Sequence, residues 1–187
     1  TLTDTLGNNI FDGGSGIDII TAGSGNDFIA GGIGNDTITT GTGADVIAFN
    51  RGDGMDTLNA STGKDNTISL GKGIKYADLL FKKSGNNLIL VTGTNEQITL
   101  KDWYANVNNH SVANLQVVIE GTSDYNAAST NKLNNKKSEQ FNFDGLVTKF
   151  DQARIANPSL TSWALSSSLL EFYLAGSDTA ALGGDLS

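Results

Sequence analysis

A nine-residue repeat near the start of the chain limits what this protein can fold into more than any other feature. Four consecutive units, GGSGIDIIT, AGSGNDFIA, GGIGNDTIT and TGTGADVIA, fill residues 13–48. Position four is always Gly, position six is always Asp and position eight is always Ile. Each unit thus has one place for a tight turn, one for a charge and one for a core side chain. This pattern indicates a stacked array of one structural unit.

Imperfect copies extend the array in both directions. Upstream, the segment DTLGNNIFD puts Asn9 at position six. Downstream, a two-residue insertion precedes RGDGMDTLN, which restores Asp56 at position six, and a last unit at 60–68 supplies Asp65. Terminal units of repeat arrays are commonly atypical. We therefore expect the array to form one domain over residues 1–65.

The chemistry of the turn positions favours calcium. Gly at positions two and four adopts backbone angles that other residues adopt poorly, so the turn can fold sharply and aim its carbonyl oxygens inward. The Asp at position six adds a carboxylate. Oxygen ligands at a flexible turn suit Ca²⁺, whereas Zn²⁺ would need His or Cys, and the chain has no Cys and a single His, His110. The candidate metal ligands are Asn9, Gly13, Ser15, Gly16, Asp18, Gly23, Ser24, Gly25, Asp27, Gly31, Gly32, Ile33, Gly34, Asp36, Gly41, Thr42, Gly43, Asp45, Gly52, Asp53, Gly54, Asp56 and Asp65.

Two interpretations without metal were weighed against this one. A flexible Gly-rich linker has no reason to keep an apolar residue at position eight. A metal-free β-solenoid would keep it, but it would bring the acidic turns of successive coils together without compensation. Alternation around position eight predicts very short strands, which are stable only when neighbouring units stack on them.

The repeat resembles that of the RTX (haemolysin-type calcium-binding) family. The resemblance implies a right-handed parallel β-roll in which two nonapeptides make one coil and Ca²⁺ lies between turns one coil apart. Ligands would then be about eighteen residues apart in sequence. About three calcium sites are expected, and up to about five. One edge would stack Asn9, Asp27, Asp45 and Asp65, and the other edge Asp18, Asp36 and Asp56.

The rest of the chain changes character, within a fold that is mainly β. In residues 66–121, the runs NTISL, DLLFKK, NLILVT and QITL are separated by turn residues and predict a short antiparallel capping region. Its KDWY segment resembles the block that commonly follows RTX repeats. Residues 122–140 are polar and predict a linker. Two segments within residues 141–187 have apolar residues at helical spacing and predict an α-helical hairpin.

Composition limits the classes of partner. The formal net charge of −8 argues against nucleic acid and anionic membranes. No apolar run approaches the ~20 residues that a membrane span needs. Without Cys there are no disulfides, so metal is the expected source of extra stability.

The sequence therefore predicts a calcium-binding module and no enzyme. It contains no HExxH, GxSxG, GxGxxG or P-loop motif. As the family resemblance implies, the module would be secreted by type I secretion, would fold on Ca²⁺ after export, and would stabilise a larger extracellular protein or aid its secretion. The alternative is a calcium-dependent adhesion module that binds carbohydrate or a cell surface. The tripeptide Arg51-Gly52-Asp53 matches a cell-attachment sequence, but each residue already has a repeat position, which favours coincidence.

Overall fold

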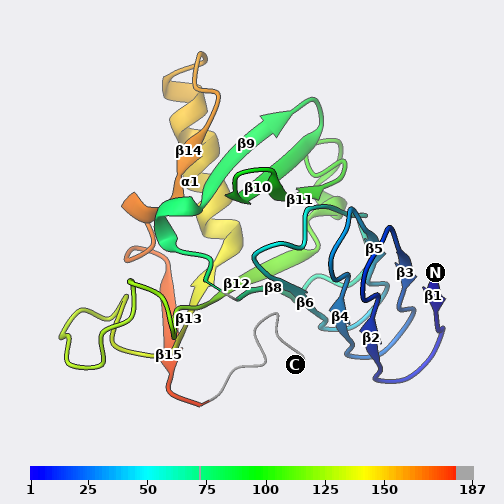
Figure 1. Ribbon diagram of the computed structural model, residues 1–187. Coiled ribbons are helices and arrows are strands. Elements are labelled where there is room, and N and C mark those ends of the chain that lie inside the picture. Colours follow the sequence, from blue (N-terminus) through cyan, green and yellow to red (C-terminus); the bar gives the residue numbers. More distant parts are fainter. Residues whose placement is uncertain (72, 180–187) are drawn as a thin grey trace.

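The computed structural model describes residues 1–71 and 73–179, so the end of the tail expected at 141–187 lies outside the described residues. The chain builds a roll of short strands in its N-terminal part and a cap of longer strands and one helix in its C-terminal part (Figure 1). The N-terminus lies at the free end of the roll, far from the cap (Figure 1).

The roll consists of strands of two to five residues that alternate between two sheets. The first sheet contains β1 (Leu2–Thr3), β3 (Ile19–Thr21), β5 (Thr37–Thr39) and β7 (Met55–Leu58). The second sheet contains β2 (Ile10–Asp12), β4 (Phe28–Ala30), β6 (Val46–Phe49) and β8 (Asn66–Leu70). Neighbouring strands of the roll are parallel in both sheets. Two nonapeptides therefore make one coil.

The position-eight side chains meet inside the roll. Ile20 pairs with Ile38 in the first sheet, and Ile29 pairs with Ile47 in the second. None of the four is more than 2% exposed. Because side chains alternate along a strand, position eight faces the core, while none of the position-seven side chains of the four repeats is fully buried. Burial of each Ile contributes about 1.5–3 kcal/mol.

Both sheets continue from the roll into the cap without a break. Strand β11 (Glu96–Leu100) lies parallel to β7, and β12 (Val112–Val118) lies parallel to β8. Antiparallel pairing begins beyond them, where β9 (Leu80–Ser84) and β10 (Asn87–Gly93) form a meander with β11. The segment NTISL is thus β8, the last strand of the roll, because it pairs with β6 in the same parallel register as the strands before it.

Two 3₁₀ helices lie between these strands, and one more strand extends the second sheet. The 3₁₀ helices η1 (Tyr76–Asp78) and η2 (Val107–Asn109) lie before β9 and β12. Strand β13 (Ser138–Asn142) begins inside the polar segment 122–140 and pairs antiparallel with β12. That segment therefore ends in a sheet.

The C-terminal helical hairpin predicted for residues 141–187 is wrong. Helix α1 (Phe143–Ala156) forms, and the side chain of its N-cap Asn142 accepts the N–H of Gly145 at 2.9 Å. No second helix pairs with it among the described residues. The following segment instead forms β14 (Trp163–Ala164), the 3₁₀ helix η3 (Leu165–Ser167) and β15 (Tyr173–Ser177).

The two strands of this segment complete sheets that already exist. Strand β14 pairs with β9, and β15 pairs with β13. Apolar residues that have helical spacing in the sequence therefore pack against two different sheets. Open sheet edges offer backbone hydrogen bonds that outweigh a weak local helix preference.

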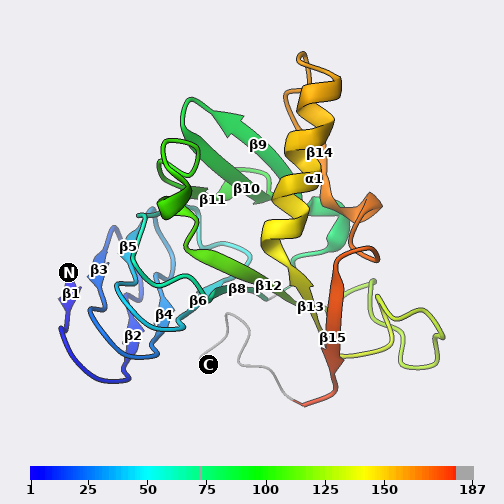
Figure 2. The same ribbon diagram turned by 180° about the vertical axis from the view of Figure 1, so that it is seen from behind.

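One apolar core runs from the roll into the cap. It includes Ile47 and Leu58 of the roll together with Phe81 and Trp103 of the cap. Helix α1 packs against β12 (Figure 2), and its Phe143 meets Phe81 edge to face at 5.4 Å. The cap therefore covers the last apolar layer of the roll. Within residues 1–71 and 73–179, no helix is long and apolar enough to cross a membrane.

Candidate metal centre

The turns of the roll stack along two edges, and each turn comprises the first six residues of a repeat. We call the edge with turns 4–9, 22–27, 40–45 and 61–66 the first edge, and the edge with turns 13–18, 31–36 and 51–56 the second edge. Isolated parallel bridges join Ser24 to Thr42 on the first edge and Ser15 to Ile33 on the second. Turns that are one coil apart are therefore in direct contact.

The position-six side chains form a ladder along each edge. One carboxylate oxygen, Oδ1, accepts the backbone N–H of the position-six residue one coil earlier. The bonds run from Asn9 to Asp27 at 2.7 Å, from Asp27 to Asp45 at 2.9 Å, from Asp18 to Asp36 at 2.8 Å and from Asp36 to Asp56 at 2.9 Å. The expected stacking of these residues at one-coil spacing is thus present.

The second carboxylate oxygen of the ladder is the feature that points to a cation. Oδ2 of Asp27, Asp36 and Asp45 is buried and has no hydrogen-bond partner. None of these three residues is more than 3% exposed. A buried carboxylate oxygen without a partner is costly. An oxygen in this state is a ready ligand for a metal ion.

Glycines at position four let the backbone of successive turns come close together. Gly34 and Gly43 have φ values of +155° and +120°, which residues with a Cβ rarely adopt. A Cβ at Gly34 would overlap the carbonyl oxygen of Gly16, and one at Gly43 would overlap that of Gly25. The position-four carbonyl oxygen of one turn therefore points at the turn one coil later.

These donors fit calcium. In the part of the chain that the structure describes, no three Asp, Glu, His or Cys side chains come together. A cation between two turns would take one or two carboxylates and would complete its shell with carbonyl oxygens. A set of about six to eight oxygens in flexible geometry is what Ca²⁺ prefers. Zn²⁺ would find neither nitrogen nor sulfur here.

The electrostatics of the ladder also favour a cation. Burial raises the pKa of Asp36 and Asp45, the ladder N–H lowers it, and the carboxylate one coil earlier raises it again; the Thr40 hydroxyl also lowers the pKa of Asp45. The effect is largest for Asp56, where burial outweighs the N–H bond and the nearby charges of Asp36 and Asp53 add to it, raising the pKa to about 7. The carboxylates therefore bear their charge at a cost that a bound cation would offset.

A comparison with protein-family models agrees with this geometry. The model of the RTX calcium-binding nonapeptide repeat matches four copies, over residues 3–38, 12–47 and 21–55. Residues 3–55 are RTX calcium-binding nonapeptide repeats. The matched family describes a calcium-binding structural module and no enzyme activity. No curated protein matches the sequence.

Calcium binding by the RTX repeats should weaken as the pH falls below 7. At about pH 8 Asp56 is largely ionised, but at about pH 6 it carries a proton that calcium must displace, so the calcium midpoint should rise by up to about tenfold per pH unit. The stability of the calcium-free roll should depend on pH in the opposite direction. Because the pKa of Asp56 is raised in the folded state, that state loses stability as the pH rises from 3.8 towards 7. Calcium titrations followed by circular dichroism at the two pH values measure this. Asp56→Asn should flatten the dependence, and equal midpoints in the unsubstituted protein would contradict it.

Asp65 does not take its expected place in the RTX ladder. Its neighbour Asn66 does, because Asn66 Oδ1 accepts the N–H of Asp45 at 2.9 Å. Asn66 is fully buried, whereas Asp65 is exposed. The predicted stacking of Asp65 on Asp45 is therefore wrong by one residue. The sequence held a signal for this, since the core residue Ile68 follows Asn66 by two positions, as position eight follows position six in every repeat.

A second ladder at position five was missed in the sequence. Asn8 Oδ1 accepts the N–H of Asn26 at 2.8 Å, and Asn26 Oδ1 accepts that of Ala44 at 2.9 Å. On the second edge, Asn35 Oδ1 accepts the N–H of Met55 at 2.9 Å. The available signal was the Asn that precedes position six in three of the repeats. These amides hold successive turns at a fixed spacing beside the carboxylates.

The remaining predicted ligands lie in the stacked turns or next to them. Asp53 is buried at position three of the turn 51–56, and its Oδ2 accepts the N–H of Asn50 at 2.7 Å. Asp18 begins its ladder, and its Oδ1 accepts the terminal amine of Thr1 at 3.1 Å. The stacked turns also contain Gly13, Ser15, Gly16, Gly23, Ser24, Gly25, Gly31, Gly32, Ile33, Gly34, Gly41, Thr42, Gly43, Gly52 and Gly54.

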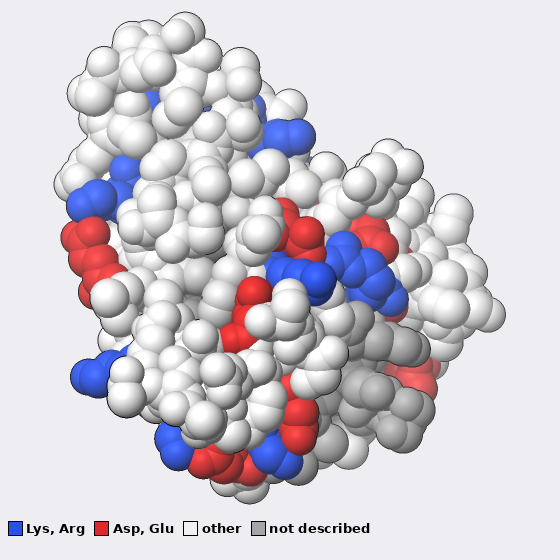
Figure 3. All heavy atoms as spheres, turned by 60° about the vertical axis from the view of Figure 1, so that its left-hand side comes forward, with Lys and Arg blue, Asp and Glu red and all other residues white. Residues whose placement is uncertain are grey.

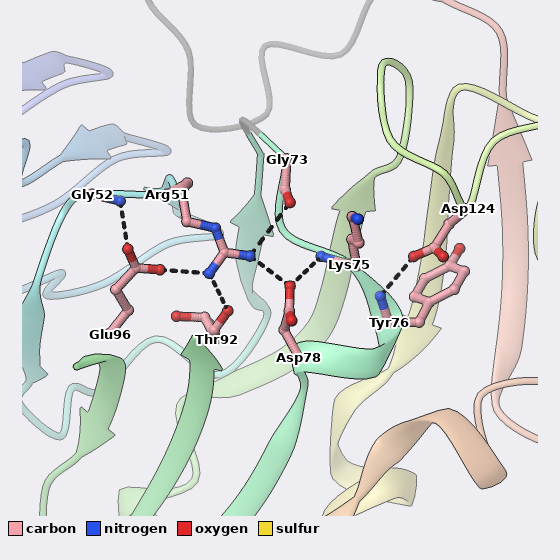
Figure 4. A network of polar contacts seen from close by, with 9 residues as sticks. All are labelled: Arg51, Gly52, Gly73, Lys75, Tyr76, Asp78, Thr92, Glu96 and Asp124. Carbon is pink, nitrogen blue, oxygen red and sulfur yellow. Dashed lines mark hydrogen bonds and ion pairs between the residues drawn. The ribbon is translucent and has the colours of Figure 1, made fainter. Parts of the chain in front are cut away.

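Arg51 joins the RTX roll to the cap (Figure 4). Its guanidinium donates to Asp78 Oδ2 at 2.5 Å, to Glu96 Oε2 at 2.8 Å and to the carbonyl oxygen of Thr92 at 3.0 Å. Gly52 donates its N–H to Glu96 Oε1 at 2.9 Å. The Arg-Gly-Asp tripeptide is therefore engaged in an internal network and is not presented as an extended loop.

Charges on the surface of the cap are mixed. Figure 3 shows a face on which Lys and Arg side chains lie beside Asp and Glu. Ion pairs of the cap include Lys137 with Glu120 at 2.7 Å and Lys149 with Glu171 at 2.9 Å. Exposed pairs of this kind contribute little to stability. Among the described residues of this face, positive charges sit next to negative ones instead of forming a basic patch.

Proposed function

We propose that the roll binds Ca²⁺ between turns one coil apart on both edges, and that it folds only when calcium is bound. The observation that carries this proposal is the buried, unpartnered Oδ2 of Asp27, Asp36 and Asp45. Each lies in a turn whose glycine carbonyl oxygens face the next coil. Carboxylate and carbonyl oxygens at one place form a calcium cage, and the same arrangement without a cation leaves charge buried.

The apolar content of the repeats supports the requirement for metal. Each nonapeptide contributes one fully buried large side chain, such as Ile29 or Ile38. That burial contributes about 1.5–3 kcal/mol, while ordering nine backbone residues costs about 1 kcal/mol or more per residue. The parallel ladder bonds add only modest net stability. Calcium binding would add the free energy that the apolar side chains of the repeats do not supply.

The biological role follows from where calcium is abundant. Weak extracellular modules bind Ca²⁺ with dissociation constants of roughly 10⁻⁴ to 10⁻³ M, so they fill outside the cell and stay empty inside it. The module is therefore unfolded before export, passes through a type I exporter in that state, and folds outside. Once folded, it stabilises the extracellular protein to which it belongs.

Equilibrium dialysis against calcium, with the metal counted by mass spectrometry, tests the proposal. We expect several calcium ions per chain, retained in the presence of an excess of Mg²⁺, which demands a smaller and more rigid octahedral site. Asp36→Asn should reduce the count, whereas the matched change Asp12→Asn, at an exposed residue outside the ladder, should not. A chain that retains no calcium above its magnesium background would refute the proposal.

A further inference from the structure

The last turn of the first edge, residues 61–66, differs from the turns stacked before it. It reads STGKDN where the preceding turn reads TGTGAD. Lys64 stands at position four, where the other turns have Gly, and Asn66 stands at position six, where they have Asp or, at the far end, Asn9. The backbone still stacks, because Gly63 donates its N–H to the carbonyl oxygen of Gly41 at 2.8 Å.

Asn66 fills the place of the unpartnered carboxylate oxygen with an amide nitrogen. Its Oδ1 accepts the N–H of Asp45, which fixes the orientation of the side chain. Its Nδ2 then donates to the hydroxyl of Thr40 at 3.1 Å and to that of Ser61 at 3.5 Å. Thr40 in turn donates to Ser61 at 2.8 Å, and both Thr40 and Asn66 are fully buried. The amide nitrogen is only a donor and offers no lone pair to a cation, and the two hydroxyls beside it are already engaged in hydrogen bonds with it and with each other.

Lys64 supplies a positive charge to the same turn. Its ammonium donates to the carbonyl oxygen of Ser61 at 3.1 Å and also to that of Asn108, in η2 before β12. Backbone carbonyl oxygens are the atoms that a calcium ion would use in such a turn. The backbone N–H of Asn66 donates to Ser111 at 3.3 Å, so the turn is also tied to the cap.

We propose that this turn closes the first edge without metal: the Asn66 amide and the Lys64 ammonium replace a calcium ion, and the space between turns 40–45 and 61–66 takes none. The inference rests on the proposed function of the roll. It leaves four inter-turn positions for calcium, one for each ladder bond that ends on an Asp side chain. Asp45 then borders one calcium position, whereas Asp27 on the same edge borders two.

The calcium count of matched variants tests the closure. By equilibrium dialysis, the unsubstituted protein should bind up to four ions, Asp27→Ala should lose two and Asp45→Ala should lose one; both residues are buried, so the comparison is matched. Asn66→Ala should keep the full count. The double variant Asn66→Asp, Lys64→Gly should gain one ion, because it restores the carboxylate and the glycine of the repeat.

Failure of the closure can be told apart from failure of the proposed function. A chain that binds no calcium contradicts the function itself. A fifth ion in the unsubstituted protein, equal losses from Asp27→Ala and Asp45→Ala, or loss of one ion from Asn66→Ala would overturn the closure and leave the function standing. Circular dichroism at saturating calcium confirms that each variant is folded when its ions are counted.

Discussion

Removing calcium should unfold the RTX roll, and adding it back should restore the strands, while Mg²⁺ should not. A ligand at 100 times its dissociation constant stabilises the folded state by about 2.7 kcal/mol per site. A few such sites equal the total stability of an ordinary domain, about 5–15 kcal/mol. Once the cation is gone, the buried carboxylates would also repel each other along each edge, Asp27 with Asp45 and Asp36 with Asp56. Loss of the roll is therefore expected to be complete.

Two spectroscopic signals separate the roll from the cap in this experiment. Site-resolved amide hydrogen exchange follows β2 to β6, which lie in the roll, whereas far-ultraviolet circular dichroism reports the strands of the roll and the cap together. Fluorescence follows Trp103 and Trp163, the two tryptophans of the chain, which both lie in the cap. Exchange protection of the roll strands should disappear in excess chelator and return with calcium. Unchanged protection in chelator would show that the roll folds without metal.

Asp36→Ala should raise the calcium midpoint more than Asn9→Ala. Asp36 lies in the middle turn of its edge, where its Oδ1 accepts the N–H of Asp18 and its own N–H reaches Asp56. Its removal takes a charged ligand from the cation positions on both sides. A hydrogen bond to a charged group alone contributes about 1.5–3 kcal/mol, so a rise of about tenfold or more is expected.

Asn9 is the matched contrast because it lies at the end of its ladder and carries no charge. Its contribution to the ladder is its backbone N–H, which Asn9→Ala retains. The amide that the substitution removes donates only to Leu6 and Gly7 of the same turn. Calcium titrations followed by circular dichroism would give both midpoints. Equal shifts, or a larger shift for Asn9→Ala, would mean that ions do not lie between turns one coil apart.

Local repetition made much of the roll predictable. Position eight identified the core residues Ile20, Ile29, Ile38 and Ile47. The acidic position identified both ladders, from Asn9 to Asp45 and from Asp18 to Asp56. The nine-residue spacing is sufficient for this because every contact in a stacked array repeats one coil later. Calcium could be named from the same residues, because oxygen-rich Gly turns without Cys leave few other metals.

The residue that occupies position six of the last turn was harder to predict from the sequence, because insertions shift the nine-residue register. Asp65 and Asn66 are neighbours, and the acid is the obvious candidate for an acidic position. Asn66 takes this position because side chains two residues apart lie on the same side of a strand. Since Ile68 is buried in the core, the side chain of Asn66 also points inward and joins the ladder. The packing of Ile68 therefore outweighed the acidic character of Asp65.

The sequence by itself determined the repeat unit, its core and charged positions and the metal that suits them, since these depend on residues within nine positions of each other. Only the tertiary structure decided what closes the array. The segment 160–176 has helical spacing, but it contains β14 and most of β15, because β9 and β13 offer unpaired edges. Likewise, the Lys64 ammonium donates to the carbonyl oxygen of Asn108 in η2, which lies far along the chain. Such choices depend on which strands lie at the edge of a finished sheet, and local periodicity carries no information about that.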